Sequence, residues 1–255
     1  MPAGAEPVRP AGARAGLQTA LDIAIAPRAA CAALREAPTW GWAFAIAALL
    51  GMIATLAMNP IWLHVLEREL PARFAATGQI AQMPADARNA LIAQQLGLAK
   101  TLTGFSFLLI PFVLAGGCAL QALVMLAANA LGGGDGTFKK FWALAVNAAV
   151  VGTGIASVAL LAIALLRGPD AFPSSADVAN AVPGLGTFVS PEAKPAAAFL
   201  SAINVFAVWD SVLLATGMII VARLPRGSAI AAALVILAGT GVFPLAGAAL
   251  QNGLK

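Results

Sequence analysis

Long uninterrupted runs of apolar residues dominate the sequence, and polar residues gather in the segments between them. Five runs stand out: Gly41–Leu63, Leu102–Leu131, Phe141–Leu166, Ala202–Val221 and Ser228–Leu250. Each has about 20 residues or more, and an α-helix of that length crosses the ~30 Å hydrocarbon layer of a bilayer. The pattern therefore predicts an all-α fold, a polytopic transmembrane helical bundle with one span in each run.

A short helix is expected directly before the first run. Residues 27–37 begin with Pro27, which suits the first turn of a helix, and are followed by Pro38, which marks its end. Three apolar positions of this segment share one face at helical spacing: Ala30, Cys31 and Leu34. A helix with one apolar face and charges on the other lies along a membrane surface. The segment is therefore interpreted as a short N-terminal interfacial helix, with a plain linker as the alternative.

The N-terminal residues predict no folded element. Residues 1–20 are rich in Ala, Gly and Pro, contain Arg9 and Arg14, and lack the apolar core of a cleavable signal peptide. They are interpreted as a disordered tail, followed by a single membrane domain over residues 21–250. The segment 167–201 contains five prolines and is expected to be an irregular loop.

Composition supports a membrane protein. Hydrophobic residues make up 60% of the chain and charged residues 10%, and the mean hydropathy is +0.88. A soluble domain of that composition would have too little polar surface. The net charge of +4 does not indicate nucleic-acid binding, because the 15 Lys and Arg are scattered among the ends of the apolar runs and form no patch along the sequence.

Basic residues in the connecting segments predict the orientation in the membrane. Six of them lie before the first run or between neighbouring runs: Arg28, Arg35, Lys139, Lys140, Arg223 and Arg226. Short loops rich in Lys and Arg stay in the cytoplasm, so these loops and the N-terminus are expected there, and an odd number of spans places the C-terminus outside. The loop 64–101 weakens this prediction, because it contains basic and acidic residues interspersed. The six residues are also candidate contacts with anionic lipid headgroups or partner proteins.

The sequence contains little material for catalysis or for binding metal ions. His64 is the only histidine and lies outside any set of residues with metal-ligand spacing. The only cysteines, Cys31 and Cys118, are expected to lie at different depths and to be free thiols. No nucleophile elbow or phosphate-binding loop occurs, and the GGGDG segment at 132–136 is interpreted as a turn. We therefore expect no enzyme activity, no metal site and no cofactor.

One acidic residue lies within an apolar run. A carboxylate near the centre of a bilayer costs about 2.5–3.5 kcal/mol on insertion scales, so Asp210 is expected to be neutral, paired or turned toward a polar interior. In one interpretation it forms an intramembrane polar site for a proton, an ion or a substrate with Asn147, Asn204 or Gln121. In the other, the neighbouring Trp209 marks a membrane interface, and the carboxylate is hydrated or caps a helix.

Two features of the apolar runs concern helix geometry. The second run contains Pro111 followed by Gly116 and Gly117, which predicts a kink or a break. Small residues at four-residue spacing on the third run predict the close approach of another helix: Ala148, Gly152 and Ala156.

Two stretches resemble bacterial members of the Ypt-interacting-protein (Yip-domain) family. In DIAIAPRAACAALREAP, an apolar residue, a proline, a leucine and a second proline precede the first span: Ile25, Pro27, Leu34 and Pro38. In INVFAVWDSVLLATGMIIVARLPRGSAIAAAL, a Phe and a Trp precede an apolar helix with a glycine, a basic turn and an Ala-rich final helix: Phe206, Trp209, Leu213, Leu214, Gly217 and Ala229. The resemblance covers roughly residues 20–248.

The resemblance implies a multi-pass protein of the bacterial inner membrane with five spans and a cytoplasmic N-terminus. Eukaryotic members associate with small GTPases and help organise vesicle membranes, partly through longer tails, and the shorter tail here argues against GTPase binding. The expected function is organisation of the membrane or of partner proteins, including other copies of the chain, through helix and lipid contacts. The alternative is a small transporter, permease subunit or channel that uses Asp210 and a broken second span.

Overall fold

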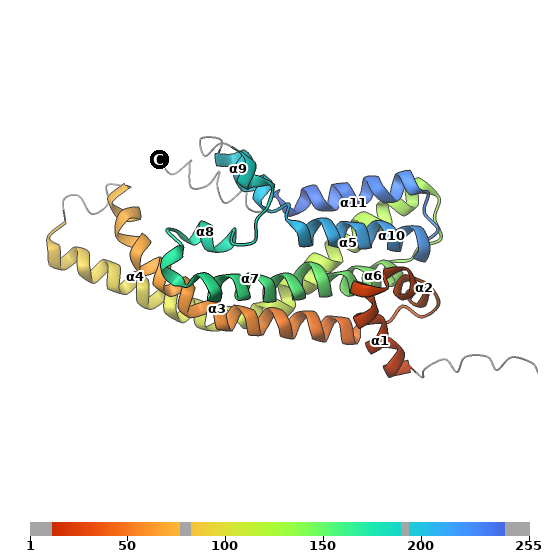
Figure 1. Ribbon diagram of the computed structural model, residues 1–255, viewed down its shortest axis with the longest axis horizontal. Helices are drawn as coiled ribbons and strands as arrows, with labels where there is room; N and C mark the ends of the chain where they lie inside the picture. Colours follow the sequence, from red (N-terminus) through yellow and green to blue (C-terminus); the bar gives the residue numbers. More distant parts are fainter. Residues whose placement is uncertain (1–11, 77–82, 190–193, 243–255) are drawn as a thin grey trace, which may run out of the picture.

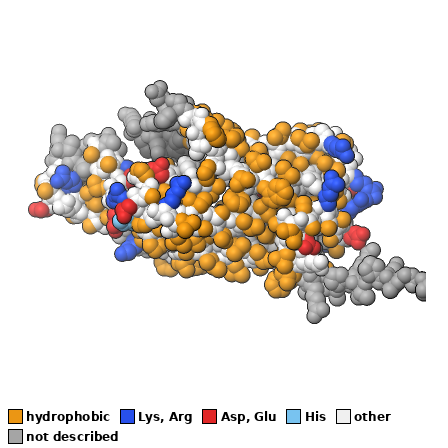
Figure 2. Space-filling view, viewed as in Figure 1, with side chains coloured by type: hydrophobic (Ala, Val, Ile, Leu, Met, Phe, Trp, Pro, Cys, Tyr) orange, Lys and Arg blue, Asp and Glu red, His pale blue; other side chains and the backbone are white. Residues whose placement is uncertain are grey.

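The computed structural model describes residues 12–76, 83–189 and 194–242, and the regular elements within these ranges are helices (Figure 1). The one pairing of extended backbone among them is an isolated bridge between Gly184 and Asn204. The longest helices lie along the long axis of the molecule, and apolar side chains cover the middle of the face in Figure 2. The predicted all-α fold is confirmed.

Three helical segments of the described chain are long and apolar enough to cross a membrane. The first is α3, Gly41–Ala76. The second joins α4, the 3-10 turn η1 and α5: Ala85–Ser106, Phe107–Leu109 and Ile110–Gly132. The third joins α6, the π-helical segment η2 and α7: Phe138–Ala149, Val150–Ile155 and Ala156–Arg167. These segments contain the first three predicted spans.

The fourth and fifth apolar runs form shorter helices. They are α10, Val205–Val221, with 17 residues, and α11, Arg226–Thr240, with 15 residues. At 1.5 Å per residue they reach about 26 and 22 Å, which is less than the ~30 Å hydrocarbon layer. The predicted fifth span continues into residues 243–250, which lie outside the described residues.

The segment 64–101 differs from the expected loop. α3 continues to Ala76 and α4 begins at Ala85, so most of this segment is helical. The residues that follow Leu63 are largely Leu, Glu, Arg and Ala, whose high helix propensity continues the helix beyond the apolar run and past Pro71. α3 and α4 pack against each other (Figure 1).

The N-terminal part also differs from the prediction. Residues 12–20, which were expected in a disordered tail, belong to α1, Gly12–Ile25, and residues 1–11 lie outside the described residues. α1 packs against α2 and α3, and its residues Ala20 and Ile23 are fully buried. The small side chains that suggested disorder here allow close packing between helices.

The predicted helix before the first long span is present as α2, Pro27–Glu36. The three apolar residues that were expected to share one face are buried: Ala30, Cys31 and Leu34. α2 contacts α1, α6 and α10, so protein covers the face that sequence analysis turned toward a membrane surface. Burial raises the pKa of the free Cys31 thiol to about 11, which keeps the thiol protonated at neutral pH.

α6 lies at the centre of the bundle. Every residue over 143–149 is buried, and α6 contacts α1, α2, α3, α5 and α10. Apart from Asn147 the stretch 143–149 is apolar, and the neighbouring helices bury all of its sides. The approach of α10 depends on Gly217, because a Cβ at this position would overlap the side chain of Leu144.

The segment 167–201 folds against the bundle. Its described residues, 167–189 and 194–201, form four short helices: η3 Pro169–Ala171, α8 Ser175–Ala179, η4 Leu185–Phe188 and α9 Lys194–Ser201. The amide and the hydroxyl of Ser175 donate to Glu69 of α3 at 3.0 and 2.8 Å. Phe172 and Val178 are buried against α3 and α7 in a small second core. The segment that was expected to be an irregular loop therefore packs against the C-terminal half of α3.

The GGGDG segment is a turn, as predicted, and its backbone contacts the connection between α10 and α11. Gly133 ends α5 in the left-handed region, with φ 72°. The amide of Asp135 donates to the carbonyl of Ala222 at 2.8 Å. A Cβ at Gly134 would overlap the Asn129 side chain and lie 2.7 Å from the Ala222 carbonyl oxygen. The close contact between the two connections therefore requires glycine.

Gly134→Ala is expected to destabilise the bundle, because the added methyl group meets backbone atoms of the neighbouring connection. Overpacking of this kind costs about 1–3 kcal/mol. The measurement is the thermal denaturation midpoint of the purified chain in detergent. Gly227→Ala is the control at the same end of the bundle, since nothing lies within 4 Å of a Cβ there. An equal loss of stability in both variants would contradict the packing argument.

Candidate functional site

α10 places an acidic side chain inside the bundle. Asn204 caps this helix, because its Oδ1 accepts hydrogen bonds from the amides of Phe206 and Ala207 at 3.0 and 3.1 Å. Asp210 follows in the second turn and is only 7% exposed. The capping role that sequence analysis considered for Asp210 is therefore filled by Asn204.

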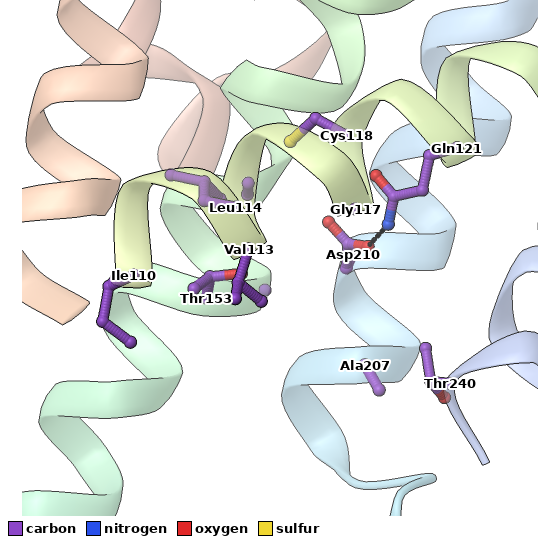
Figure 3. Close-up of a pocket in the computed structure, with 12 residues that line it drawn as sticks. Ile110, Val113, Leu114, Gly117, Cys118, Gln121, Thr153, Ala207, Asp210 and Thr240 are labelled. Carbon is purple, nitrogen blue, oxygen red and sulfur yellow. Dashed lines mark hydrogen bonds between the residues drawn. The ribbon is translucent and has the colours of Figure 1, made fainter. Parts of the chain in front are cut away.

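The carboxylate has a single hydrogen bond among the described residues. Gln121 of α5 donates from Nε2 to Asp210 Oδ2 at 3.4 Å (Figure 3). Asp210 Oδ1 is buried and has no hydrogen-bond partner in the described part of the chain. Gly152 of η2 approaches so closely that a Cβ there would lie 2.8 Å from the Asp210 carboxyl carbon. A buried acceptor without a partner costs about 1–3 kcal/mol, so this oxygen marks a candidate binding site.

The carboxylate borders a cavity of about 280 Å³. Figure 3 shows residues of α5 on one side of this cavity and residues of η2, α10 and α11 around the rest. Four of the described lining residues have polar side chains other than the thiol of Cys118: Gln121, Thr153, Asp210 and Thr240. The cavity therefore combines mostly apolar walls with a few polar groups, as ligand sites in proteins do.

Two departures from regular α-helix occur beside the cavity. The π-helical segment η2 supplies Gly152 and Thr153, and π turns are frequent at functional sites. The 3-10 turn η1 lies just before Pro111, which has no amide hydrogen to donate along the helix. The expected irregularity of the second span is thus at Pro111, whereas Gly116 and Gly117 lie within regular α5.

The carboxylate lies far from both ends of the long helical segment formed by α6, η2 and α7, the α6–η2 rod. Its neighbour Gly152 is 12 residues from Lys140 and 15 residues from Arg167, the nearest charged residues on either side in that segment. At 1.5 Å per residue these separations are about 18 and 22 Å. Asp210 therefore lies near the middle of an apolar rod and far from both of its charged ends.

The four predicted polar residues do not form one site in the structure. Only Asp210 and Gln121 contact each other. Asn147 is fully buried in α6, where its Nδ2 donates to the carbonyl of Thr39 at 2.9 Å and to a carbonyl of its own helix at 2.7 Å. This amide ties α6 to the connection between α2 and α3. Asn204 caps α10, so two of the four residues have structural partners away from the carboxylate.

Several residues that line the cavity give no signal in the sequence. Cys118, Thr153 and Thr240 had no assigned role beside Asp210, because their proximity depends on how separate helices meet. Gly152 did give a signal, since it belongs to the predicted stripe of small residues. In the structure its missing side chain leaves room for the carboxylate on α10.

The six basic candidate residues gather at one end of the molecule. They lie on α2, at the start of α6 and in the connection between α10 and α11, and Figure 2 shows Lys and Arg side chains at that end of the apolar belt. Arg223 pairs with Asp135 at 3.6 Å. Trp142 meets Trp40 edge to face and stacks on Phe138, with centroids 5.9 and 6.4 Å apart. Tryptophan beside basic residues is typical of a membrane–water interface.

No cluster of three or more His, Cys, Asp and Glu that could hold a metal ion occurs among the described residues. His64 contacts Asp170 at 3.2 Å, and the two cysteines are buried free thiols. Comparison with known proteins adds no identification: no family model, curated protein or solved structure matches the chain. The function is therefore inferred from the residues and their geometry.

Gly152→Ala is expected to lower the thermal midpoint of the purified chain in detergent, because the new methyl group would crowd the Asp210 carboxylate. The penalty should be smaller in an Asp210→Ala background. A double-mutant cycle over the two positions measures this coupling, which we expect at about 0.5–3 kcal/mol.

Gly116→Ala on α5 is the matched control for this cycle, since nothing lies within 4 Å of a Cβ there. It should show no coupling to Asp210→Ala. Additive effects of Gly152→Ala and Asp210→Ala would contradict direct contact between the two positions.

Proposed function

We propose that the chain is a five-span membrane protein of the Yip-domain type that organises the membrane, or partner proteins within it, without catalysing a reaction. The observation that carries this proposal is the basic end, where six Lys and Arg residues gather beside stacked aromatic side chains at the edge of an apolar belt. Each basic residue near an anionic membrane surface contributes about 1 kcal/mol to binding. Such an end is suited to lipid headgroups.

Five membrane crossings are consistent with the order and the directions of the helices along the chain (Figure 1). α10 and α11 lie beside the long helical segments (Figure 1), and a bilayer thins around a short helix at modest cost. α2, the turn between α5 and α6, and the connection between α10 and α11 are at the same end of the molecule. The positive-inside rule assigns this end and the N-terminus to the cytoplasm of a bacterial inner membrane, with the C-terminus outside.

The residues that resemble the Yip-domain pattern occupy structurally defined positions, which supports this proposal. Pro27 begins α2, and Pro38 follows the end of that helix. Leu34 is fully buried, and Gly217 lies where α10 meets α6. Other copies of the chain or other membrane proteins are the partners proposed for the exposed apolar faces.

A second candidate function is favoured by a different observation, the cavity beside Asp210. The carboxylate lies midway along an apolar rod and next to a π-helical segment. The cavity lining also includes Ile110, which directly follows a 3-10 turn. Irregular helices around a buried acid are features of substrate sites in transporters. A small transporter, permease subunit or channel, assembled from more than one copy, is therefore the alternative.

Single cysteines test the orientation and the crossing between Lys139 and Asp170. In a Cys31→Ala/Cys118→Ala background, Lys139→Cys should react with a membrane-impermeant maleimide only after spheroplasts of the expression host are permeabilised. Asp170→Cys should react in intact spheroplasts, because one crossing separates the two positions. Both native side chains are exposed, so access depends on the membrane. Reaction of both cysteines from the same side would contradict the proposed topology.

Arg223→Gln/Arg226→Gln is expected to weaken retention of anionic lipid by roughly thirtyfold, because two charges of about 1 kcal/mol each are lost near the headgroups. Native mass spectrometry measures the lipid retained by the chain after purification with equal amounts of phosphatidylglycerol and phosphatidylcholine. The control Arg88→Gln/Lys100→Gln removes two charges from α4 instead. Equal retention by the native chain and the first variant would argue against headgroup binding at the basic end.

A further inference from the structure

The cavity beside Asp210 favours ligands of one charge. Its lining includes one carboxylate and no Lys, Arg or His among the described residues. Oδ1 of this carboxylate has no partner in the described chain, and Oδ2 receives only the 3.4 Å hydrogen bond from Gln121. An ionised carboxylate in such surroundings costs several kcal/mol without a countercharge. A bound cation would offset that cost, whereas a bound anion would add to it.

The walls of the cavity distinguish between kinds of cation. A hard metal ion such as Ca²⁺ takes about 6–8 oxygen ligands, and few side chains of the lining contain oxygen: Gln121, Thr153, Asp210 and Thr240. The remaining lining is Ala, Gly, Val, Leu, Ile and Cys. An organic ammonium ion fits this combination, because its N–H groups donate to the carboxylate while its carbon atoms contact the apolar walls.

The volume of the cavity and its opening to the surface suit a small organic ammonium ion. The cavity of about 280 Å³ is close to the lower end of the ~300–1,000 Å³ range of ligand sites, which leaves room for an amine with a single ring. Val113 lines the cavity and is 69% exposed in the described part of the chain, and Gly117 and Thr240 are exposed as well. The cavity therefore reaches the outer surface of the bundle at its α5 and α11 walls.

We propose that this cavity binds a small organic ammonium ion, whose nitrogen donates hydrogen bonds to the carboxylate of Asp210 and whose apolar body lies against α5 and η2. Gly152 belongs to the site, because a side chain there would occupy the space beside the carboxylate. The site is about 18 Å along the α6–η2 rod from Lys140 at the basic end. Binding here goes beyond the lipid contacts proposed above, and either proposal can fail without the other.

Equilibrium dialysis of radiolabelled benzylammonium against the full chain in lipid nanodiscs tests the proposal. The native chain is expected to bind it saturably, with about one ligand per chain. Asp210→Asn keeps the shape of the side chain and removes its charge, so it should bind at least about tenfold more weakly. Asp177→Asn is the matched control, since it removes an exposed carboxylate of α8 outside the cavity, and it should bind like the native chain.

Competitors test the chemical class of the ligand. Benzyl alcohol has the same ring without the charge and should not displace benzylammonium, and neither should sodium or potassium ions in moderate excess. Displacement by sodium or potassium would identify an inorganic cation site, and displacement by benzyl alcohol would identify an uncharged apolar cavity. Either result would overturn the proposal, as would unsaturable binding or equal binding by Asp210→Asn.

A measurement on the native chain covers the case in which Asp210→Asn does not fold. Dicyclohexylcarbodiimide is an apolar reagent that modifies carboxyl groups within a membrane, and mass spectrometry of peptides locates the product. It is expected to label Asp210, and benzylammonium is expected to slow this labelling while benzyl alcohol does not. Labelling of Asp210 at the same rate with and without benzylammonium would overturn the proposal.

Discussion

Close packing of small side chains around α6 is the constraint on which the rest of the structure depends. Helices in hydrocarbon gain little from excluding water, so their association relies on van der Waals contact between closely approaching backbones. Alanine dominates the buried stretch 143–149, and Gly217 lets α10 approach the same helix. α1 and α2 cover further sides of α6, and so a segment that composition made look unstructured contributes to the core.

The same packing creates the polar site. Gly152 lies in a π-helical segment, where its missing side chain leaves space for the carboxylate of Asp210 on the neighbouring helix. Gln121 approaches from a third helix, but its amide reaches only one of the two carboxylate oxygens. Tight contact between α10 and η2 thus encloses an acid for which the described cavity lining supplies no positively charged partner. The cavity beside it provides the volume in which a countercharge can bind.

Two parts of the molecule therefore have opposite chemistry. The basic end combines cationic side chains with stacked aromatic rings and suits anionic headgroups at a membrane surface. The cavity has a negative group and apolar walls and suits a cation of limited size. The two lie about 18 Å apart along one helical rod.

The sequence by itself determined the helical class, the first three long apolar segments, the short helix α2 and the turn after α5, because these depend on local length, periodicity and turn chemistry. It did not reveal that residues 12–20 and most of 64–101 are helical, since composition does not show whether a helix beyond an apolar run finds a partner to pack against. Only the tertiary structure decided that Asp210 meets Gln121 and Gly152 instead of the other predicted polar residues. Those contacts join separate helices, and the rotation of each helix about its own axis is set by packing across the whole bundle.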